Sequence, residues 1–463
     1  MTTMRPGPTV REAARDLPVF AAVDVLVVGG GPAGVSAAVG AARMGAKTLL
    51  LERHGFLGGM WTAGMVLTLA GYNCWLRPYV RAVDGVPGEW LRRAVSLGGA
   101  EDNAGFVLNS EPEVMKLVAD ELLAEAGAET LFHTWAAAPI VQGGAVVGLC
   151  IENVDGRSAV LAGATVDCTG DGEVFARAGN AWEKSDSLQP MTMPFRMVGA
   201  ALDPAISHSA PQCVPIGPEP GMLGEPVLGD HSSRRNDVPF DPRLMRQQRA
   251  AGRLPSYGGP WFGGLDKDVL WVNSTRHYGD ASNVRDLTRA EIEGRRSSRA
   301  ISEFLTRTPG LQGARLLQTS TQIGVRETRR LVGNYTMTGN DVRSGTAFND
   351  SVAVGCWPID VHPADGEVGM HQMYVPLPYG IPYRSLIPRT VEGLVVAGRC
   401  ISVDRDALGS TRVGATCAAI GHAAGVAAAL AAGDGVSPSR VDVAALQGAL
   451  IEQGAIVSPG QVG

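Results

Sequence analysis

Paired cysteines are missing from this chain. Its 463 residues include seven cysteines, which are scattered and form no C-x-x-C pair. This pattern argues against a disulfide scaffold, a zinc site and an iron–sulfur cluster, so we expect no metal centre. We expect most of the cysteines to be reduced, buried and apolar in their behaviour.

The chain also lacks a large excess of charge of either sign. The net charge is −6 and the pI is near 5.8, with neither a basic patch for nucleic acid nor a run of like charges. The first 20 residues mix arginine with acids and lack an apolar core, so we expect no secretion signal, no membrane anchor and a cytoplasmic protein. Residues 415–432 are nearly free of charge but mostly alanine and glycine, which favours a core helix over a membrane span. These absences favour small-molecule chemistry.

What the chain does have is a strand, glycine loop, helix and strand unit over residues 23–52. An apolar run at 25–28 precedes a G-x-G-x-x-G loop and an alanine-rich helix over 35–44. The glycines permit a tight turn, close approach to a pyrophosphate and close helix packing at the positive end of the helix. Glu52 ends the second strand, where its carboxylate can accept hydrogen bonds from a ribose 2′-OH. A purely structural glycine turn would not explain this spacing, and we predict a dinucleotide site at Gly29, Gly31, Pro32, Ala33, Gly34 and Glu52.

Several other elements can be expected along the chain. Ser110 is a candidate cap for a helix over 111–126, and residues 138–167 alternate β-rich runs with glycine turns, which predicts a three-stranded meander. Residues 286–305 have the pattern of an amphipathic helix, followed by an expected β segment at 316–335. A buried strand near 394–397 and a long alanine helix from about residue 412 resume the first pattern.

The fold class that follows is α/β in two parts. We expect a Rossmann-like cofactor domain, discontinuous over 20–181 and 380–435, with a parallel sheet and a β meander. An inserted α+β substrate domain would occupy 182–379, with a tail at 1–19 and a C-terminal helix and tail at 436–463.

Six further motifs occur in order behind the glycine loop. They are ERHGFLGGMWT, DCTGDGEVFARAG, GVRETRRLVGNY, PIDVH, IPYRSLIP and AGRCISVDRDALGSTRVGATCAAIGHAAG. The chain resembles the bacterial FAD-dependent oxidoreductases of the glutathione-reductase-like class with two dinucleotide-binding domains, over residues 23–457. The resemblance implies extended FAD, bound covalently or non-covalently, with its adenine end at residues 29–34 and Glu52. It also implies a second nucleotide-side motif at Thr169, Gly170 and Asp171.

Two other segments suit the same cofactor. Directly behind the ribose acid, a glycine-rich loop can run beside bound FAD; it includes Arg53, Gly58, Gly59 and Met60. A loop at 409–412 is expected to open the alanine helix, whose positive end attracts an anion by roughly 0.3–1 kcal/mol. Ser410, Thr411 and Arg412 would then face the anionic N1–C2=O edge of reduced flavin, although a simple packing helix is the alternative reading.

One motif departs from the wider class. The Gly-Asp pair that usually holds the ribityl chain is replaced by Gly398 and Arg399, followed by Cys400. Asp404 and Asp406 lie nearby, so the acid that would contact the ribityl hydroxyls is not assigned by sequence. Cys400 has no partner cysteine and does not form a redox disulfide of the disulfide-reductase type.

The candidates for catalysis fall in four clusters. On a strand, Arg326 would share a face with Thr328 and Arg330 and suit an anionic substrate such as a carboxylate, unless these residues form an ion-pair network with Glu327. Asp360 can orient His362 as a base, the alternative being an ordinary hydrogen-bonded histidine. The last two clusters are Tyr383 with Arg384, where the chain re-enters the cofactor domain, and Arg276 with His277.

A single dinucleotide fingerprint predicts no NAD(P)H domain, so electrons should pass between the substrate and oxygen, a quinone or another protein. The leading hypothesis is a dehydrogenase or oxidase that moves a hydride between a small organic substrate and flavin. A monooxygenase is the enzymatic alternative. An electron-transfer subunit predicts iron–sulfur cysteines or a docking tail, and the sequence shows neither. A homo-oligomer and FAD attachment at His54 are left open.

Overall fold

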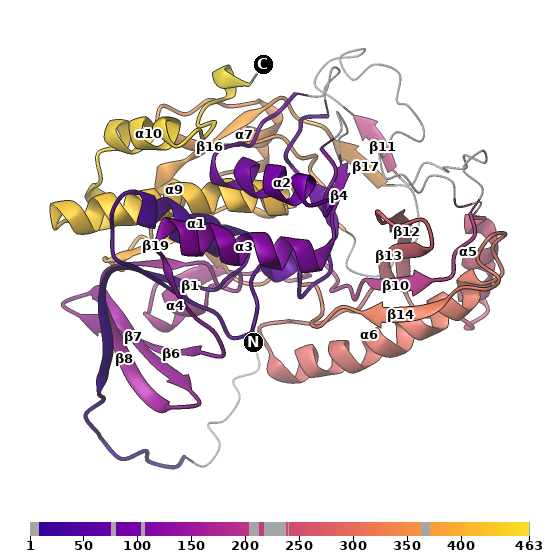
Figure 1. The fold of residues 1–463 in the computed structure, drawn as a ribbon, viewed down its shortest axis with the longest axis horizontal. Helices are drawn as coiled ribbons and strands as arrows, with labels where there is room; N and C mark the ends of the chain where they lie inside the picture. Colours follow the sequence, from indigo (N-terminus) through magenta and orange to yellow (C-terminus); the bar gives the residue numbers. More distant parts are fainter. Residues whose placement is uncertain are drawn as a thin grey trace.

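The computed structural model describes residues 9–75, 80–102, 107–202, 213–216, 238, 240–362 and 371–462. Its largest sheet has seven strands in the order β5-β2-β1-β8-β7-β6, with β19 paired to β8 (Figure 1). Strands β5, β2, β1, β8 and β19 run parallel, whereas β8, β7 and β6 form an antiparallel meander. The predicted α/β class, parallel sheet and meander are therefore confirmed. The strands are β1 Val19–Val28, β2 Thr48–Leu51, β5 Glu129–Leu131, β6 Trp135–Gln142, β7 Ala145–Asn153, β8 Gly156–Asp167 and β19 Leu394–Val396.

Two helices pack closely against the parallel strands. Helix α1 (Pro32–Arg43) lies beside the alanine-rich helix α9 (Gly414–Asp434). Glycines at 421 and 425 allow this approach, because a Cβ there would lie 2.0 and 1.9 Å from the carbonyl oxygens of Ala33 and Ala37. Within the described part of the chain, α9 alone is long and apolar enough to cross a membrane, yet 83% of its most apolar window is buried. Helix α9 is therefore a core helix, as predicted.

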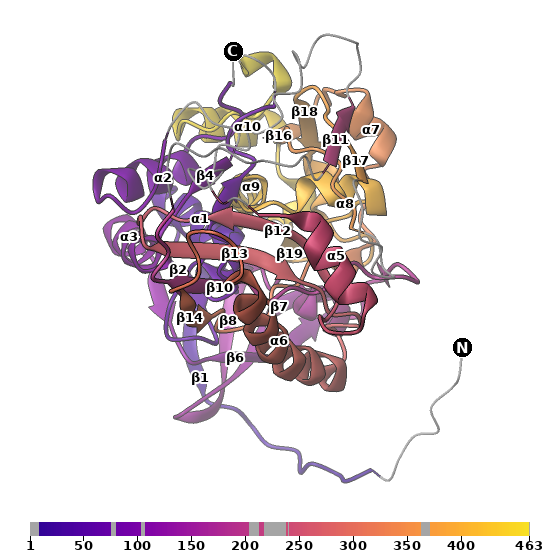
Figure 2. The ribbon, with the colours of Figure 1, turned by 90° about the vertical axis from the view of Figure 1, so that its right-hand side faces the viewer.

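A second, smaller sheet lies to one side of the first in Figure 1 and faces the viewer in Figure 2. Its four antiparallel strands run in the order β12-β13-β10-β14, with bounds Tyr257–Gly263, Val269–Thr275, Phe195–Val198 and Arg315–Thr319. The long helix α6 (Val284–Leu305) packs on this sheet and is capped by Asn283, whose side chain accepts from two backbone N–H groups. It matches the predicted amphipathic helix over 286–305.

The remaining elements complete the fold. The helices are α2 Val86–Ser96, α3 Pro112–Ala126, α4 Glu173–Arg177, α5 Pro242–Ala250, α7 Gly339–Arg343, α8 Arg405–Thr411 and α10 Val443–Glu452, with 3-10 turns at Gly59–Trp61 (η1), Tyr383–Ser385 (η2), Pro438–Arg440 (η3) and Pro459–Gln461 (η4). The strands are β3 Thr68–Ala70, β4 Val107–Asn109, β9 Trp182–Glu183, β11 Cys213–Ile216, β15 Arg330–Leu331, β16 Ser351–Gly355, β17 His371–Tyr374 and β18 Tyr379–Pro382.

Three local predictions are wrong. The expected β segment at 316–335 contains only β14 and β15, because backbone N–H groups between them bond to the main chain of Ala63 and Thr192 instead of a strand ladder. Ser110 donates its hydroxyl to the carbonyl of Leu67 and does not cap α3. Residues 409–411 are the last turn of α8, and the alanine helix begins at Gly414.

The packing defines two main hydrophobic cores. The larger takes in side chains from residues 23–175 and 331–457, and the smaller spans 195–314. Leu331, Met337 and Val352 belong to the larger core, although they lie within the predicted substrate domain. We therefore propose that the second boundary falls near residue 330 and not at 380.

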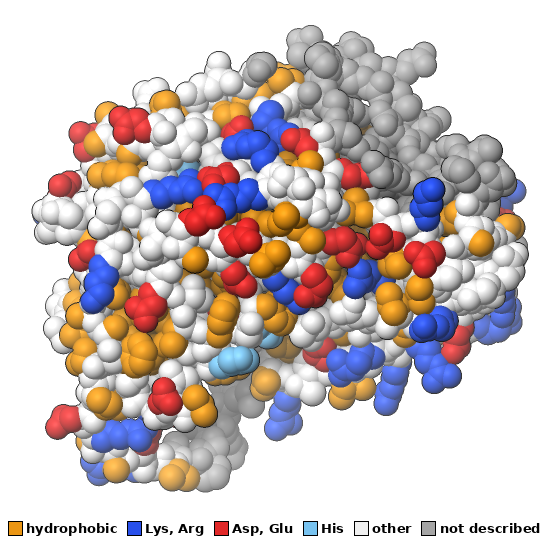
Figure 3. Space-filling view, viewed as in Figure 1, with side chains coloured by type: hydrophobic (Ala, Val, Ile, Leu, Met, Phe, Trp, Pro, Cys, Tyr) orange, Lys and Arg blue, Asp and Glu red, His pale blue; other side chains and the backbone are white. Residues whose placement is uncertain are grey.

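Charges of both signs are interspersed over the face in Figure 3. Ion pairs join neighbouring helices: Arg93 of α2 lies 2.6 Å from Glu125 of α3, and Arg43 of α1 lies 2.8 Å from Glu89 of α2. This mixture agrees with the absence of like-charge runs in the sequence.

Candidate active site

The glycine loop between β1 and α1 is packed so tightly at Gly29, Gly30 and Gly34 that side chains are excluded there. Gly29 has φ +99°, and a Cβ on Gly34 would lie 1.7 Å from the carbonyl oxygen of Gly29. Gly31 is the N-cap of α1, with Pro32 at the first helical position, no side-chain cap and no acid in the first turn. The positive end of α1 therefore lacks a side chain that would compete with a phosphate.

Glu52 is held in place by two backbone donors. Its Oε2 accepts from Gly30 N at 2.7 Å and its Oε1 accepts from His54 N at 2.8 Å, and only 8% of the residue is exposed. Each carboxylate oxygen has a second lone pair, so the group can still accept ribose hydroxyls. Glu52 directly follows β2, at the predicted end of the second strand, and its binding of the ribose stays a prediction.

The glycine-rich segment behind Glu52 runs along the glycine loop, and its predicted course beside bound FAD stays a prediction. Gly58 N donates to Gly30 O at 2.8 Å, and a Cβ on Gly59 would lie 2.7 Å from Gly31 Cα. Met60 follows in the short helix η1. Arg53 and His54 turn to Gln322, whose Oε1 lies 3.1 Å from Arg53 Nη2 and 2.8 Å from His54 Nε2. His54 thus has a hydrogen-bond partner in the protein, and FAD attachment at this residue stays an untested prediction.

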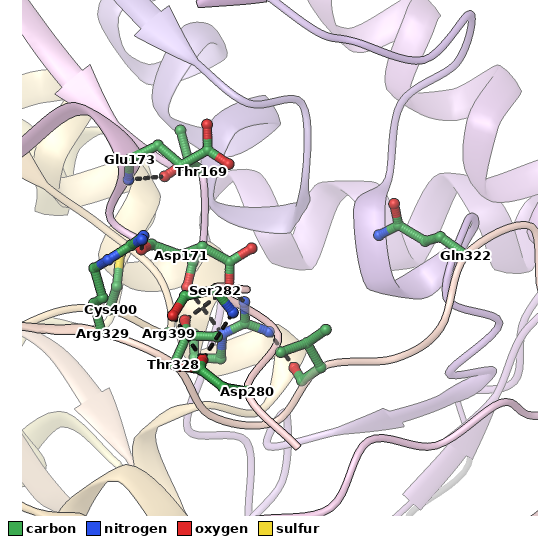
Figure 4. Close-up of polar contacts among 12 residues, drawn as sticks. Thr169, Asp171, Glu173, Asp280, Ser282, Gln322, Thr328, Arg329, Arg399 and Cys400 are labelled. Carbon is green, nitrogen blue, oxygen red and sulfur yellow. Dashed lines mark hydrogen bonds and ion pairs between the residues drawn. The ribbon is translucent and has the colours of Figure 1, made fainter. Parts of the chain in front are cut away.

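Two distant motifs meet around Asp171, as the close-up in Figure 4 shows. Its Oδ1 accepts from Arg399 Nη2 at 2.6 Å and from Thr328 Oγ1 at 2.7 Å, while Arg399 Nε donates to Gly170 O at 2.9 Å. Thr169 donates its hydroxyl to Asp167 at 2.7 Å. The arginine in the place of the usual acid is therefore neutralised by the acid of the preceding motif.

The same contacts suggest which acid faces the cofactor. A Cβ on Gly398 would lie 3.3 Å from Ala33 Cβ, so the residues before Arg399 reach the start of α1. Asp404 caps α8 by accepting from Ala407 N at 2.8 Å, and Asp406 pairs with Arg343. Asp171 has partners on its Oδ1 as well, but its Oδ2 accepts from none of the described residues, and we propose Asp171 as the acid next to the ribityl chain.

Ser410 and Thr411 are not in a loop. Ser410 Oγ lies 2.5 Å from Tyr379 Oη and also donates to the carbonyl of Trp357, and Thr411 donates to Ala407 O at 3.0 Å. Arg412, which follows α8, donates through Nη2 to the carbonyl of Asp360 at 2.8 Å and lies 3.3 Å from its Oδ2. Of these three residues, only Arg412 reaches the group of charged residues around Asp360 that is described next.

Two arginines converge on one hydroxyl beside the end of β13 in the smaller sheet. Thr192 Oγ1 accepts from Arg276 Nη1 at 2.9 Å and from Arg326 Nη1 at 2.5 Å, and donates to Thr275 O at 2.9 Å. Burial is the main cause that lowers the pKa of Arg276 to about 10, and the charge of Arg412 lowers it further. Burial is also the main cause that lowers the pKa of Arg326, and the charges of Arg276 and Arg412 add to this effect. Like charges this close require a ligand or a partner.

The predicted Asp360–His362 pair forms without a strand. His362 Nε2 lies 3.3 Å from Asp360 Oδ2, and the His362 backbone N–H donates to Gln189 Oε1 at 3.1 Å. Burial lowers the pKa of His362 to about 3; Asp360 opposes this, and Arg326 and Arg276 reinforce it. The imidazole is therefore neutral at pH 7.

The hypothesis of a structural network holds for part of the 326–330 segment. Arg330 Nη1 lies 2.8 Å from Glu327 Oε1, with the two side chains 7% and 0% exposed, and Glu327 also accepts from Gln189 N at 3.2 Å. Arg326 alone turns to Thr192. We name Arg276, Arg326, Arg412, Asp360 and His362 the arginine cluster.

Tyr383 and Arg384 were predicted to be catalytic, but their contacts are structural. Tyr383 Oη donates to Pro438 O at 2.7 Å, and Arg384 Nη1 donates to Asp350 Oδ1 at 2.8 Å. Arg384 also stacks on Tyr335, with its guanidinium carbon 4.6 Å from the ring centroid. We leave both residues out of the proposed chemistry. Thr192 and Gln189 are the site residues that sequence reasoning missed, because neither lies in a recognisable motif.

The fold and the glycine-loop site define a Rossmann-type dinucleotide-binding protein. The chain belongs to the FAD dependent oxidoreductase family, which it matches over residues 24–450. It is therefore a flavin enzyme whose cofactor is FAD. The narrower assignment to bacterial, glutathione-reductase-like enzymes remains a prediction.

Sequence relatives match over limited stretches. Thiamine thiazole synthase of Methanococcus aeolicus is 32% identical over 132 residues, 28% of this chain and 45% of that protein. The thiamine thiazole synthase of Methanococcus vannielii is 59% identical over 44 residues, 9% and 17% of the two chains. Dihydrolipoyl dehydrogenase of Trypanosoma brucei brucei is 53% identical over 45 residues, 10% and 9%. Each match covers less than half of the relative.

Solved structures resemble the chain over a greater length at low identity. A geranylgeranyl bacteriochlorophyll reductase-like protein from Thermoplasma acidophilum has a TM-score of 0.49 and 15% identity, covering 93% of this chain and 84% of that one. The flavin-dependent brominase Bmp2 has a TM-score of 0.46 and 12% identity, covering 93% and 83%.

Proposed function

We propose that this enzyme transfers a hydride between FAD and a small anionic organic molecule bound at the arginine cluster. The observation that supports the proposal most is the pairing of His362 with Asp360 beside two arginines that share Thr192. Bound FAD would supply the two-electron acceptor or donor. Gly29 to Gly34, Glu52 and Asp171 would hold it, and the arginine cluster would orient the substrate.

His362 is suited to take or return a proton. Its neutral imidazole can accept a proton from the substrate as the hydride leaves, and Asp360 would stabilise the resulting cation. Arg412 binds both the carbonyl and the carboxylate of Asp360, which fixes the carboxylate next to the imidazole.

Substrate binding would also adjust the strength of this base. Arg326 and Arg276 help to lower the pKa of His362, so an anion that pairs with these arginines removes part of their effect. The pKa of His362 would then rise toward neutrality only when substrate is present. The base would be weak in the free enzyme and effective in the complex.

The test is anaerobic mixing of the FAD-loaded protein with separate 2-hydroxy, 2-amino and saturated carboxylic acids, while the visible flavin absorbance is followed. For the reverse direction, the dithionite-reduced protein is mixed with α,β-unsaturated acids. We expect one class to bleach or restore the flavin, and expect His362→Gln to slow this step about 100-fold or more while FAD stays bound. The exposed His133→Asn is the matched control and should behave as the parent.

Two results would contradict the proposal. One is a protein whose flavin responds to none of these acids in either direction. The other is a His362→Gln variant with the parent rate. The same traces, repeated in air and with a soluble quinone, identify the electron acceptor, and oxygen incorporated into the product would favour the monooxygenase alternative.

A further inference from the structure

The arginine cluster carries an excess of positive charge. Arg276, Arg326 and Arg412 face a single carboxylate, Asp360, while the neighbouring His362 is neutral at pH 7. The other acids close by are already paired: Glu327 with Arg330, and Asp171 with Arg399. The cluster is therefore left with two positive charges that no described side chain balances.

These cations are removed from water. Arg276 is 5% exposed and the side chain of Arg412 is 12% exposed. A buried charge without a counterion costs several kcal/mol in folding stability, so it is retained where a ligand supplies the missing charge. The excess of two indicates a ligand with two negative charges.

Unused hydrogen-bond donors support the same conclusion. Arg276 Nη2, Arg412 Nε and Gln189 Nε2 are buried and have no hydrogen-bond partner within the described ranges. All three groups donate and none accepts. The complementary ligand therefore consists of acceptors, as carboxylate oxygens are.

The donors also fall into two sets with separate anchors. Arg276 and Arg326 are fixed on Thr192, whereas Arg412 is fixed on Asp360. Two anchored sets fit two separate anionic groups better than one compact dianion such as phosphate. Trp261 covers the first set: its ring centroid lies 5.3 Å from the guanidinium carbon of Arg276 and 6.2 Å from the His362 ring.

From this arrangement we infer that the substrate is a dicarboxylate, with one carboxylate held by Arg276 and Arg326 and the other by Arg412. The inference rests on the proposed function and specifies its substrate class. Hydride transfer would take place at a carbon between or beside the two carboxylates, next to His362.

Equilibrium binding to the oxidised, FAD-loaded enzyme tests the inference without any turnover. Malonate, succinate and glutarate are titrated against butyrate, which matches succinate in length but lacks one carboxylate, and against inorganic phosphate. Binding is followed by the flavin difference spectrum and by calorimetry. Loss of one charge-assisted contact should weaken binding about tenfold or more, so one dicarboxylate should bind at least about tenfold more tightly than butyrate and phosphate.

Variants assign the two carboxylates. Arg276→Gln should abolish the preference for the dicarboxylate over butyrate, whereas Arg276→Lys should keep part of it, since the charge remains. Arg296→Gln, on the exposed face of α6, is the control and should bind like the parent. Should Arg276→Gln fail to fold, the comparison of succinate with butyrate still decides, because it uses the unmodified protein.

Butyrate binding as tightly as every dicarboxylate would overturn the inference, and so would tight binding of phosphate alone or of no acid at all. Dicarboxylate binding without electron exchange would instead contradict the proposed function and leave the binding site in place. The two failures are therefore distinguishable.

Discussion

The contact between α1 and α9 offers a quantitative test of how the cofactor site is supported. In Gly425→Ala, the new Cβ would lie 1.9 Å from Ala37 O and 2.6 Å from Ala37 Cα. An ordinary contact begins near 3.4 Å, so the two helices must separate by about 1.5 Å. Overpacking of this kind costs about 1–3 kcal/mol, which the better helix propensity of alanine offsets by about 1 kcal/mol.

The magnitude decides the assay. For a chain of this length the entropy of unfolding is about 1 kcal/mol per kelvin, so the melting temperature would shift by only a few degrees. FAD affinity is more sensitive, because α1 moves with its N-terminus and a change of 1.4 kcal/mol is tenfold. We expect Gly425→Ala to bind FAD about tenfold more weakly in equilibrium dialysis, and to unfold at a lower denaturant concentration.

The same helix contains its own control. Gly433 is exposed near the end of α9, and a Cβ there would meet nothing within 4 Å. Gly433→Ala should leave FAD affinity unchanged and should raise stability slightly, by up to about 1 kcal/mol. If Gly425→Ala binds FAD like Gly433→Ala and unfolds at the same denaturant concentration, the two helices do not pack as described.

Three other changes probe single contacts. Glu52→Gln loses one of the two acceptor oxygens that hold the loop and should weaken FAD binding about tenfold, measured by dialysis; parental affinity would contradict the ribose assignment. Asp171→Asn leaves Arg399 without its counterion and should lower the free energy of unfolding by about 2 kcal/mol in denaturant titrations. Replacing Arg399 as well, in the same protein, should not increase this loss further. Burial lowers the pKa of His422 to about 4, so the contribution of its neutral imidazole to the free energy of unfolding is complete above pH 6.5 and falls by about 1.4 kcal/mol per pH unit toward pH 4. Between pH 7 and 5, His422→Gln should therefore lose less stability than the parent, and equal losses would refute this.

The cofactor half of the site was predictable because its information is local. Gly29, Gly34 and Glu52 act through backbone conformation and chain direction within one strand-loop-helix-strand unit. The residue spacing within this unit of about 30 residues predicts both properties. Asp171 and Arg399 were found as motifs, but their ion pair was not, because it depends on how β8 and β19 pair in the sheet.

The substrate half was predicted only in part, because its residues come from separate segments. Thr192 precedes β10, Arg276 follows β13, and Arg412 follows α8. Asp360 and His362 were found through a spacing argument that assumed a strand, whereas the segment is irregular and the pair forms all the same. Local periodicity does not report contacts between such segments.

Arginine shows most clearly what the sequence cannot resolve. In the run from Arg326 to Arg330, residues of one type and similar spacing have different roles: Arg330 is neutralised by the buried Glu327, and Arg326 turns to Thr192. Arg384 looked equivalent by its position at the domain junction, yet Asp350 neutralises it. Whether an arginine is available to a substrate depends on which carboxylates reach it first, and that is a property of tertiary packing. The balance of buried charges, not the presence of arginine, is therefore what carries the substrate hypothesis.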